Sequence, residues 1–282
     1  MSTRPSTLTP TLHWILRIGV FMCFVGHGAF GIITKSAWLP YYEVFGVPED
    51  LAWRTMPIVG TMDIMIGIFA LLSPCRAVLL YGAAWCLFTA LLRPLAGQGI
   101  WETFERAGNY GVPLAFLALA GWGRSWRGWF EPIGPREPAD LDSARLGRVS
   151  TILRFTTGLL LIGHGGFGAF MHKDMLTQMY ASVGLGSLPF GAAGLTPVIG
   201  WLELLLGVAV IAAPIPALLL SIFAWKIATE MLYPLSGYPF WEFIERGGSY
   251  AAPLALFFIV KRREAAPGRE PASVSPARGH AA

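Results

Sequence analysis

The sequence predicts an all-α integral membrane protein whose eight transmembrane helices form two parallel-repeat four-helix bundles. Three observations predict this fold: the composition, a succession of apolar segments and an internal repeat. The 282 residues are 54% hydrophobic and 13% charged, and the mean hydropathy of +0.55 exceeds what a water-exposed surface tolerates. Only helices and closed barrels satisfy their backbone polar groups in hydrocarbon, and these segments lack the alternation of barrel strands.

Eight apolar segments have lengths near those that a bilayer requires. The fourth and eighth contain cleanly apolar stretches of only about 10 to 12 residues, a length that also fits a re-entrant segment. The first follows a short basic head, as a signal peptide does, but its repeat lies mid-chain, so both are predicted to be permanent helices. The segments are 14 to 33, 56 to 72, 77 to 93, 107 to 122, 151 to 171, 196 to 213, 216 to 233 and 247 to 260.

The distribution of Lys and Arg favours eight spans over six. With eight spans, the basic residues of the N-terminus, the central linker and the C-terminal tail all face the cytoplasm, where such residues collect. With six, the Arg-rich linker would lie outside. The sequence therefore predicts a multi-pass protein of the inner (cytoplasmic) membrane with both termini cytoplasmic. The pI of about 9.1 reflects this topology and does not call for nucleic-acid binding.

The two halves of the chain align with each other at a shift of about 137 to 140 residues. LRIGVFMCFVGHGAFG (16 to 31) aligns with LRFTTGLLLIGHGGFG (153 to 168), and 91 to 115 aligns with 231 to 255. Each copy has an even number of predicted spans, so the copies are expected to be parallel. The predicted domains are a first repeat (1 to 122), a cytoplasmic linker (123 to 150), a second repeat (151 to 263) and a disordered cytoplasmic tail (264 to 282).

Ionisable side chains within apolar spans are costly to bury and are candidate functional groups. His27 and Asp63 come at similar depths in the first and second spans, and His164 and Glu203 do so in the second copy. We predict a His-carboxylate pair in the outer half of each bundle, and these four residues are the predicted catalytic residues, because such a pair can hold a proton or polarise a ligand. The alternative is that each pair only satisfies its own polar groups.

The segment W-E-x-[FI]-E-R precedes the last span of each copy. One interpretation is a charged rim that binds substrate above the His-carboxylate pocket, and the other is a structural helix start, where carboxylates are favoured. Arg93 has Tyr233 as its counterpart, so a ligand that needs a cation should prefer the first copy. The predicted substrate-binding residues are Arg93, Glu102, Glu105, Arg106, Glu242, Glu245 and Arg246.

The cysteines and glycines are predicted to serve structure. Cys23, Cys75 and Cys86 are odd in number and include no C-x-x-C, which argues against a disulfide-relay enzyme. Cys23 and His27 share a helix face, but two ligands make a poor metal site, so no metal is predicted. The glycines around each His resemble a dinucleotide fingerprint, yet no strand precedes them, and within a span they let helices approach closely.

Several of these motifs resemble the DoxX-type family of four-helix membrane proteins. The resemblance rests on an L-R-x-x-x-G or similar start to the first helix, a Gly-rich half-turn before Lys35 and Lys173, and an acidic residue followed by Gly in the second helix (Asp63 to Gly67, Glu203 to Gly207). It covers both halves, as a tandem duplication. It implies membrane redox chemistry, including quinone-linked thiosulfate oxidation. The GHG element and the W-E-x-x-E-R segment do not map onto the family pattern, so no specific reaction carries over.

The predicted function is a membrane subunit of a quinone-linked redox system. His27 with Asp63, or His164 with Glu203, would handle protons for a quinone in a pocket lined by Trp38, Tyr41, Tyr42 and Phe45. The expected partners are the lipid bilayer and a redox protein, and haem between the two histidines is a further alternative. A small-solute or proton carrier and a non-catalytic scaffold also stay open, as does whether the chain is itself an enzyme.

Overall fold

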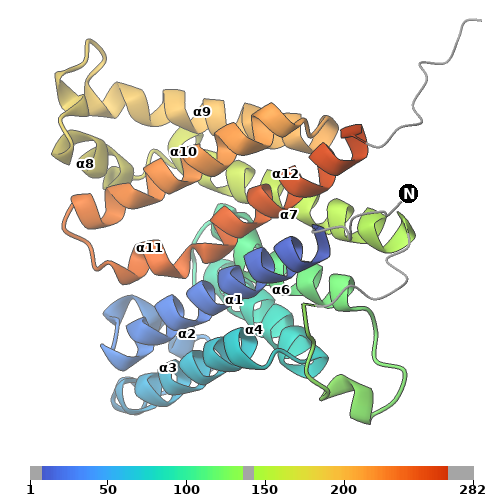
Figure 1. The fold of residues 1–282 in the computed structure, drawn as a ribbon. Coiled ribbons are helices and arrows are strands. Elements are labelled where there is room, and N and C mark those ends of the chain that lie inside the picture. Colours follow the sequence, from blue (N-terminus) through green and yellow to red (C-terminus); the bar gives the residue numbers. More distant parts are fainter. Residues whose placement is uncertain (1–7, 136–142, 266–282) are drawn as a thin grey trace, which may run out of the picture.

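The computed structural model describes residues 8 to 135 and 143 to 265, and every regular element in these two ranges is a helix (Figure 1). Each of the eight predicted segments coincides with one helix. The first half contains α1 (Leu8–Ile32), η1 (Ser36–Trp38), α2 (Leu39–Glu43), α3 (Glu49–Leu72), α4 (Arg76–Leu95), α5 (Trp101–Glu105), α6 (Ala107–Ala120) and η2 (Arg127–Trp129). The second half contains α7 (Ser143–Ala169), α8 (Asp174–Ser182), η3 (Leu185–Ser187), α9 (Gly191–Ala212), α10 (Pro216–Leu235), α11 (Trp241–Glu245) and α12 (Gly247–Ala265).

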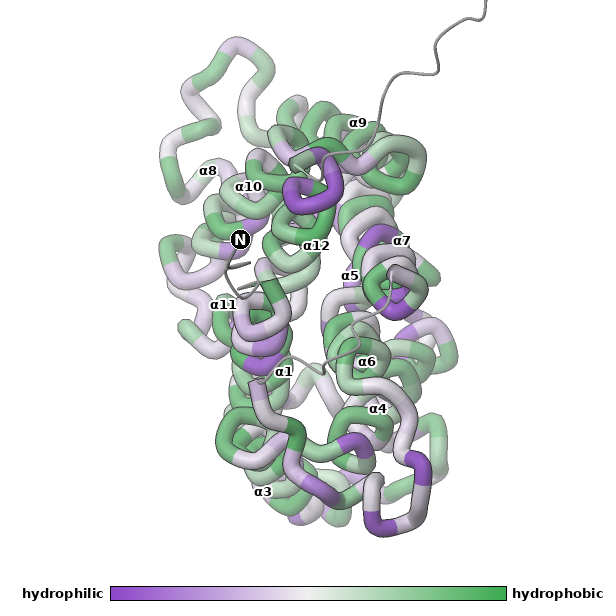
Figure 2. Tube along the Cα trace, turned by 45° about the vertical axis from the view of Figure 1, so that its right-hand side comes forward, coloured by the Kyte–Doolittle hydropathy of each residue, from purple (hydrophilic) through white to green (hydrophobic). Residues whose placement is uncertain are grey.

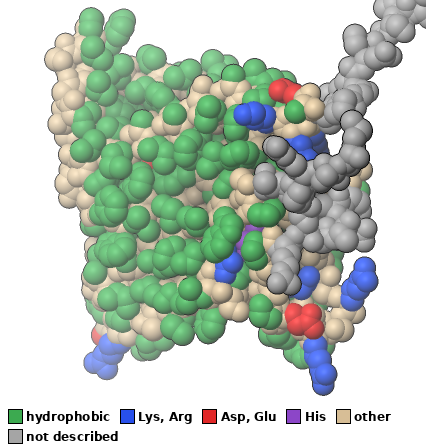
Figure 3. All heavy atoms as spheres, in the orientation of Figure 1, with side chains coloured by type: hydrophobic (Ala, Val, Ile, Leu, Met, Phe, Trp, Pro, Cys, Tyr) green, Lys and Arg blue, Asp and Glu red, His purple; other side chains and the backbone are tan. Residues whose placement is uncertain are grey.

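Among the described residues, 6 helices are long and apolar enough to cross a membrane: α1, α3, α4, α7, α9 and α10. The apolar helix α6 has 14 residues, and the 19 residues of α12 end in a basic turn. Most of the helical trace is hydrophobic, and hydrophilic residues concentrate in connections and at helix ends (Figure 2). Hydrophobic side chains cover much of one face of the molecule (Figure 3). The chain is therefore an all-helical, polytopic membrane protein.

Local sequence explains where several helices begin and end. α3 starts after Pro48 with Glu49 and Asp50 in its first turn, where the helix dipole favours acidic groups. Pro216 opens α10 at a position that needs no backbone N–H donor. α6 ends at Gly121, which has a φ of +73° that glycine adopts without strain.

The two halves share one core. α1 packs against α3 of its own half and against α11 and α12 of the other, and α7 packs in the same way against α9, α5 and α6. Figure 1 shows α12 of the second half running beside α1. Leu16, Phe116, Leu153 and Leu256, one each from α1, α6, α7 and α12, belong to a single buried apolar cluster. The fourth helix of each half thus packs against the first helix of the other half.

Glycines allow the helices of this core to approach closely. α6 and α12 meet at Gly108 and Gly248, where a Cβ on Gly108 would lie 2.7 Å from the carbonyl carbon of Gly248. A Cβ on Gly26 of α1 would lie 2.5 Å from the Cα of Glu245 in α11. Both distances are shorter than Cβ contacts in folded proteins, so only glycine fits at these positions.

Two predicted boundaries can be compared with the helices. The last part of the predicted linker is helical, because α7 begins at Ser143 rather than at residue 151, while residues 136 to 142 lie outside the described residues. α12 continues to Ala265, and the rest of the predicted tail, 266 to 282, also lies outside them.

Candidate functional site

The first predicted His-carboxylate pair forms between α1 and α3. The Nδ1 of His27 lies 2.7 Å from Oδ2 of Asp63, whose side chain is fully buried. A carboxylate can only accept, so Nδ1 carries the proton of this hydrogen bond. The two helices approach because Gly28 packs against the carbonyl oxygen of Gly60, 2.5 Å from where a Cβ would be. The predicted pairing of His27 with Asp63 is confirmed.

The second pair forms in the same way between α7 and α9. The Nδ1 of His164 lies 2.5 Å from Oε2 of Glu203, and Trp225 donates its indole N–H to the other carboxylate oxygen at 2.9 Å. Lys226 lies 3.8 Å from Glu203 and forms a 2.6 Å ion pair with Glu230. The predicted pairing is confirmed here too, but this pair belongs to a larger buried ionic group.

A cavity lies beside the first pair. His27 lines a cavity of about 140 Å³, and its ring stacks on Trp38 with a centroid distance of 4.6 Å. Phe45 and Phe88 also line the cavity and are 58% and 43% exposed, so it reaches the apolar outer surface. The four aromatic residues named from the sequence all line it. The full lining is His27, Trp38, Tyr41, Tyr42, Phe45, Val59, Trp85, Phe88, Thr89, Leu92 and Arg93.

In the second half, two buried charged side chains lie close to the His-carboxylate pair. The repeat aligns Lys226 with Cys86 and Glu230 with Ala90. Both side chains are 1% exposed and pair with each other at the centre of that half. Two small residues of the first half thus correspond to two long charged ones in the second, so the two His-carboxylate pairs have different neighbours.

Arg93 supplies a positive charge at the cavity wall. Its guanidinium lies 3.4 Å from Glu102 and 3.3 Å from the amide oxygen of Gln98, and it stands over the ring of Tyr41 at 5.2 Å. Arg93 is therefore held in place by an acidic, an amide and an aromatic neighbour while it faces the cavity.

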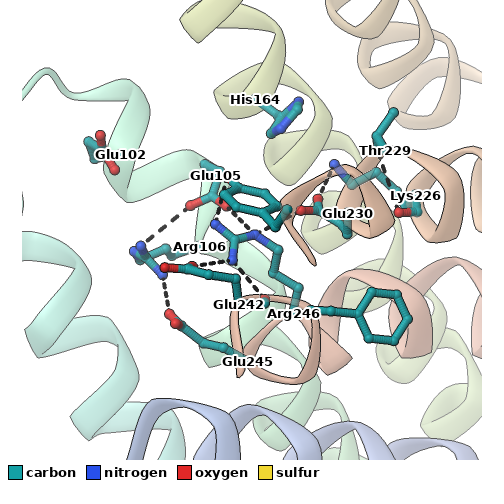
Figure 4. Close-up of polar contacts among 12 residues, drawn as sticks. Glu102, Glu105, Arg106, His164, Lys226, Thr229, Glu230, Glu242, Glu245 and Arg246 are labelled. Carbon is teal, nitrogen blue, oxygen red and sulfur yellow. Dashed lines mark hydrogen bonds and ion pairs between the residues drawn. The ribbon is translucent and has the colours of Figure 1, made fainter. Parts of the chain in front are cut away.

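The two W-E-x-[FI]-E-R segments meet at the junction of the halves (Figure 4). Arg106 lies 2.6 Å from Glu245 of the other half. Arg246 lies 3.7 Å from Glu105 of the other half and 2.8 Å from Glu242 of its own. These side chains are therefore paired mainly with one another.

Two lysines and a further carboxylate extend this cluster. Arg246 is 2.8 Å from Glu230, and Lys35 of the first half is 2.5 Å from Glu242 of the second. Lys173 pairs reciprocally with Glu102. Buried and half-buried ion pairs thus link the two halves at several points.

The charged rim over each copy's own pocket stays a prediction. Each segment also borders the histidine-bearing helix of the opposite half, because Gly26 and Gly163 pack against the backbones of Glu245 and Glu105. Among the predicted substrate-binding residues, Arg93 lines the main cavity, and Arg93 and Arg106 line a smaller one beside it. The other predicted members, Glu102, Glu105, Glu242, Glu245 and Arg246, are engaged in ion pairs.

The charge state of the junction follows from its ion pairs. Burial by itself raises the pKa of Glu105, but Arg106 and Arg246 lower it to about 2. The pKa of Glu245 is also lowered, because Arg106, His27 and Arg246 outweigh the effect of its burial. Both carboxylates are therefore ionised at neutral pH and hold the halves together as charged partners.

Of the cavity residues in α4, sequence reasoning found Arg93 but missed the others. Trp85, Phe88 and Thr89 line the cavity, but they lie in the apolar part of this span. The only available signal was the repeat itself, which aligns Trp85 with Trp225 beside Glu203.

Comparison of the chain with protein-family models, curated proteins and solved structures gives no match. Within the described parts of the chain, no group of three or more His, Cys, Asp or Glu side chains is arranged to hold a metal ion. The geometry around His27 is therefore the basis on which a function can be assigned.

Proposed function

We propose that the chain is a DoxX-like membrane subunit of a quinone-linked redox system whose first half binds a quinone-type ring beside His27. The observation that carries this proposal is the aromatic cavity next to the buried His27–Asp63 pair. An ionisable pair inside a membrane bundle marks a functional site by default, and only in the first half does such a pair line this cavity.

The size and lining of the cavity suit one six-membered ring. A cavity of about 150 Å³ in a protein core can hold benzene, and this one measures about 140 Å³. Trp38, Tyr41 and Phe88 offer aromatic faces and edges to a planar ligand. The exposed Phe45 and Phe88 place the mouth on the apolar surface, where a lipid-soluble quinone with its tail in the bilayer would arrive.

The polar groups suit proton transfer to a quinone. Reduction of a quinone to a quinol takes two electrons and two protons. Asp63 holds Nδ1 of His27, so Nε2 is the nitrogen left to exchange a proton with a ring oxygen. Arg93 would stabilise negative charge on the reduced oxygen. A redox partner protein of the membrane system is the proposed outside source or acceptor of the electrons.

The finer topology is part of the same proposal. Eight spans, two parallel repeats and cytoplasmic termini in the inner membrane are supported by the charge distribution and by the packing of α12 along α1 and of α6 along α7. The second half then has a supporting role, because its His164–Glu203 pair is surrounded by Trp225 and Lys226.

Titration of the purified full-length protein with a short-tailed 1,4-benzoquinone tests the proposal. Binding beside Trp38 and Trp85 is expected to quench tryptophan fluorescence in a saturable way. His27→Gln removes the hydrogen-bonded imidazole from the cavity and is expected to weaken binding about tenfold, or about 1.4 kcal/mol.

His164→Gln is the matched control, because it makes the same change in the half whose His-carboxylate pair lies beside Trp225 and Lys226. Its affinity for the quinone is expected to stay at the wild-type value. Each variant is first checked for membrane insertion and a single size-exclusion peak. Equal and negligible effects of the two substitutions would refute a binding site in the first half.

A further inference from the structure

A second, smaller cavity adjoins the main cavity beside His27. This inner cavity measures about 10 Å³, which is roughly the space of one water molecule. Four residues line both cavities: His27, Trp85, Thr89 and Arg93. The rest of the inner lining is Cys23, Phe24, Cys86, Arg106 and Asn109. The inner cavity therefore has room for one oxygen atom of a ligand whose ring lies in the main cavity.

Two guanidinium groups border the inner cavity, Arg93 from α4 and Arg106 from the junction of α5 and α6. Arg93 lies 3.4 Å from Glu102, but Glu102 also pairs with Lys173, so one carboxylate pairs with two cations. Asn109 is 9% exposed, and its side chain makes no hydrogen bond within the described parts of the chain. The lining thus offers positive charge and hydrogen-bond donors that its protein neighbours use only in part.

The second half shows how the equivalent arginine is satisfied. Nε of Arg246 lies 2.8 Å from the carboxylate of Glu230, which also pairs with Lys226 (Figure 4). Arg246 donates a further hydrogen bond to the hydroxyl of Tyr233 at 2.9 Å. Both oxygens come from α10, so this helix supplies one anionic and one neutral partner to the arginine.

In the first half, α4 supplies neither oxygen. The residues aligned with the two partners are Ala90, whose side chain is a methyl group, and Arg93, which is a second cation. Arg106 pairs with Glu245 through Nη1 at 2.6 Å, but its Nε lies 3.8 Å from Glu105, beyond hydrogen-bond distance. Arg106 therefore lacks, from α4, the anionic oxygen that its counterpart receives from α10.

We propose that the inner cavity is an anion subsite that receives a negatively charged oxygen attached to the ring in the main cavity. This inference rests on the proposed function and names its ligand class, a quinone with an ionised ring hydroxyl. That oxygen would accept charge-assisted hydrogen bonds from Arg93 and Arg106, as the carboxylate of Glu230 pairs with Arg246. A ring carboxylate would need more space than about 10 Å³.

Two matched ligands test the proposal. 2-Hydroxy-3-methyl-1,4-naphthoquinone is an anion at neutral pH, because the negative charge is shared between two oxygens. 2,3-Dimethyl-1,4-naphthoquinone has the same rings and stays neutral, and neither compound has a free quinone-ring position for thiol addition. Both are titrated into the full-length protein in nanodiscs and followed by tryptophan quenching. The ratio of the two affinities, here called the anion preference, is compared between variants, so that partitioning of the ligands into lipid cancels.

Arg93→Gln removes one cation of the subsite and is expected to lower the anion preference about tenfold. Ala90→Glu gives the first half the carboxylate that Glu230 provides in the second, and it is expected to lower the preference at least about tenfold. Arg54→Gln is the matched control, because Arg54 is exposed and lines neither cavity. Its anion preference should equal that of the wild type. Each variant is first checked for membrane insertion and a single size-exclusion peak.

The two proposals fail in different ways. If Arg93→Gln or a correctly inserted Ala90→Glu keeps the wild-type anion preference, the anion subsite is refuted and the quinone site stands. The subsite is likewise refuted if the neutral ligand does not displace the anionic one, because both should place a ring in the main cavity. If neither ligand gives saturable quenching in the wild type, the quinone site itself is refuted.

Discussion

Substitution of Gly163 by Ala is expected to loosen the junction between the two halves. Gly163 lies in α7 against α5, and a Cβ there would be 2.5 Å from the carbonyl carbon of Phe104 and 2.6 Å from the Cα of Glu105. These neighbours are backbone atoms, which cannot turn aside as a side chain would. The two helices must therefore separate, and the ion pair between Glu105 and Arg246 must lengthen.

The expected loss of stability in Gly163→Ala follows from the backbone clash and from helix propensity. Overpacking of a well-packed core costs about 1 to 3 kcal/mol, and contact with backbone places this case near about 3 kcal/mol. Alanine is better than glycine in a helix by about 1 kcal/mol, which offsets part of that cost. Gly163→Ala is thus expected to lose about 2 kcal/mol of stability, or roughly 4 to 8 °C in Tm.

Gly147→Ala is the matched control in the same helix. No heavy atom lies within 4 Å of the Cβ that it would gain, so only the propensity term applies. It is expected to raise stability by up to about 1 kcal/mol. Thermal unfolding of both variants in detergent, followed by tryptophan fluorescence, measures the difference. A Gly163→Ala protein as stable as Gly147→Ala would refute the close packing of the two halves.

Three further predictions concern charge and topology. Arg246→Leu leaves Glu230 and Glu242 without their shared cation and is expected to lower the free energy of unfolding in detergent by about 3 to 5 kcal/mol. The control Arg124→Leu, at an exposed position, should lower it little. Equal losses of stability in the two variants would contradict this prediction. Because the pKa of Glu105 is lowered to about 2, its stabilising effect should be complete above its ordinary pKa of about 4.3 and fade as the pH falls towards 2. Thermal unfolding between pH 5 and pH 3 should therefore depend less on pH in Glu105→Gln, and an unchanged slope would count against the ion pair. For topology, single cysteines are introduced near residues 45, 100, 180 and 240 of a cysteine-free variant. Each should react with an impermeant thiol reagent applied to spheroplasts. Reaction of a cysteine at residue 140 instead would exclude eight spans with cytoplasmic termini.

The sequence by itself determined the helices and the pairing within each half. Hydropathy predicts a helix because a backbone in lipid must satisfy its own hydrogen bonds, and this holds for each segment independently of its neighbours. The pairing of His27 with Asp63 was predictable because helical rise converts residue counts into depth, and the two helices are consecutive in the chain. The same argument held for His164 and Glu203.

Only the tertiary structure decided how the two halves pack together and which ion pairs and cavities this packing creates. The partner of Arg106 is Glu245 and not a residue of its own copy, because the fourth helix of each half packs against the first helix of the other. The cavity beside His27 is formed by side chains of η1, α2, α3 and α4 that meet across the fold, whereas His164 lies in a group of buried ions with Glu203, Lys226 and Glu230. A repeat can predict that two halves share a backbone, but the side chains that meet across helices determine which half has room for a ligand.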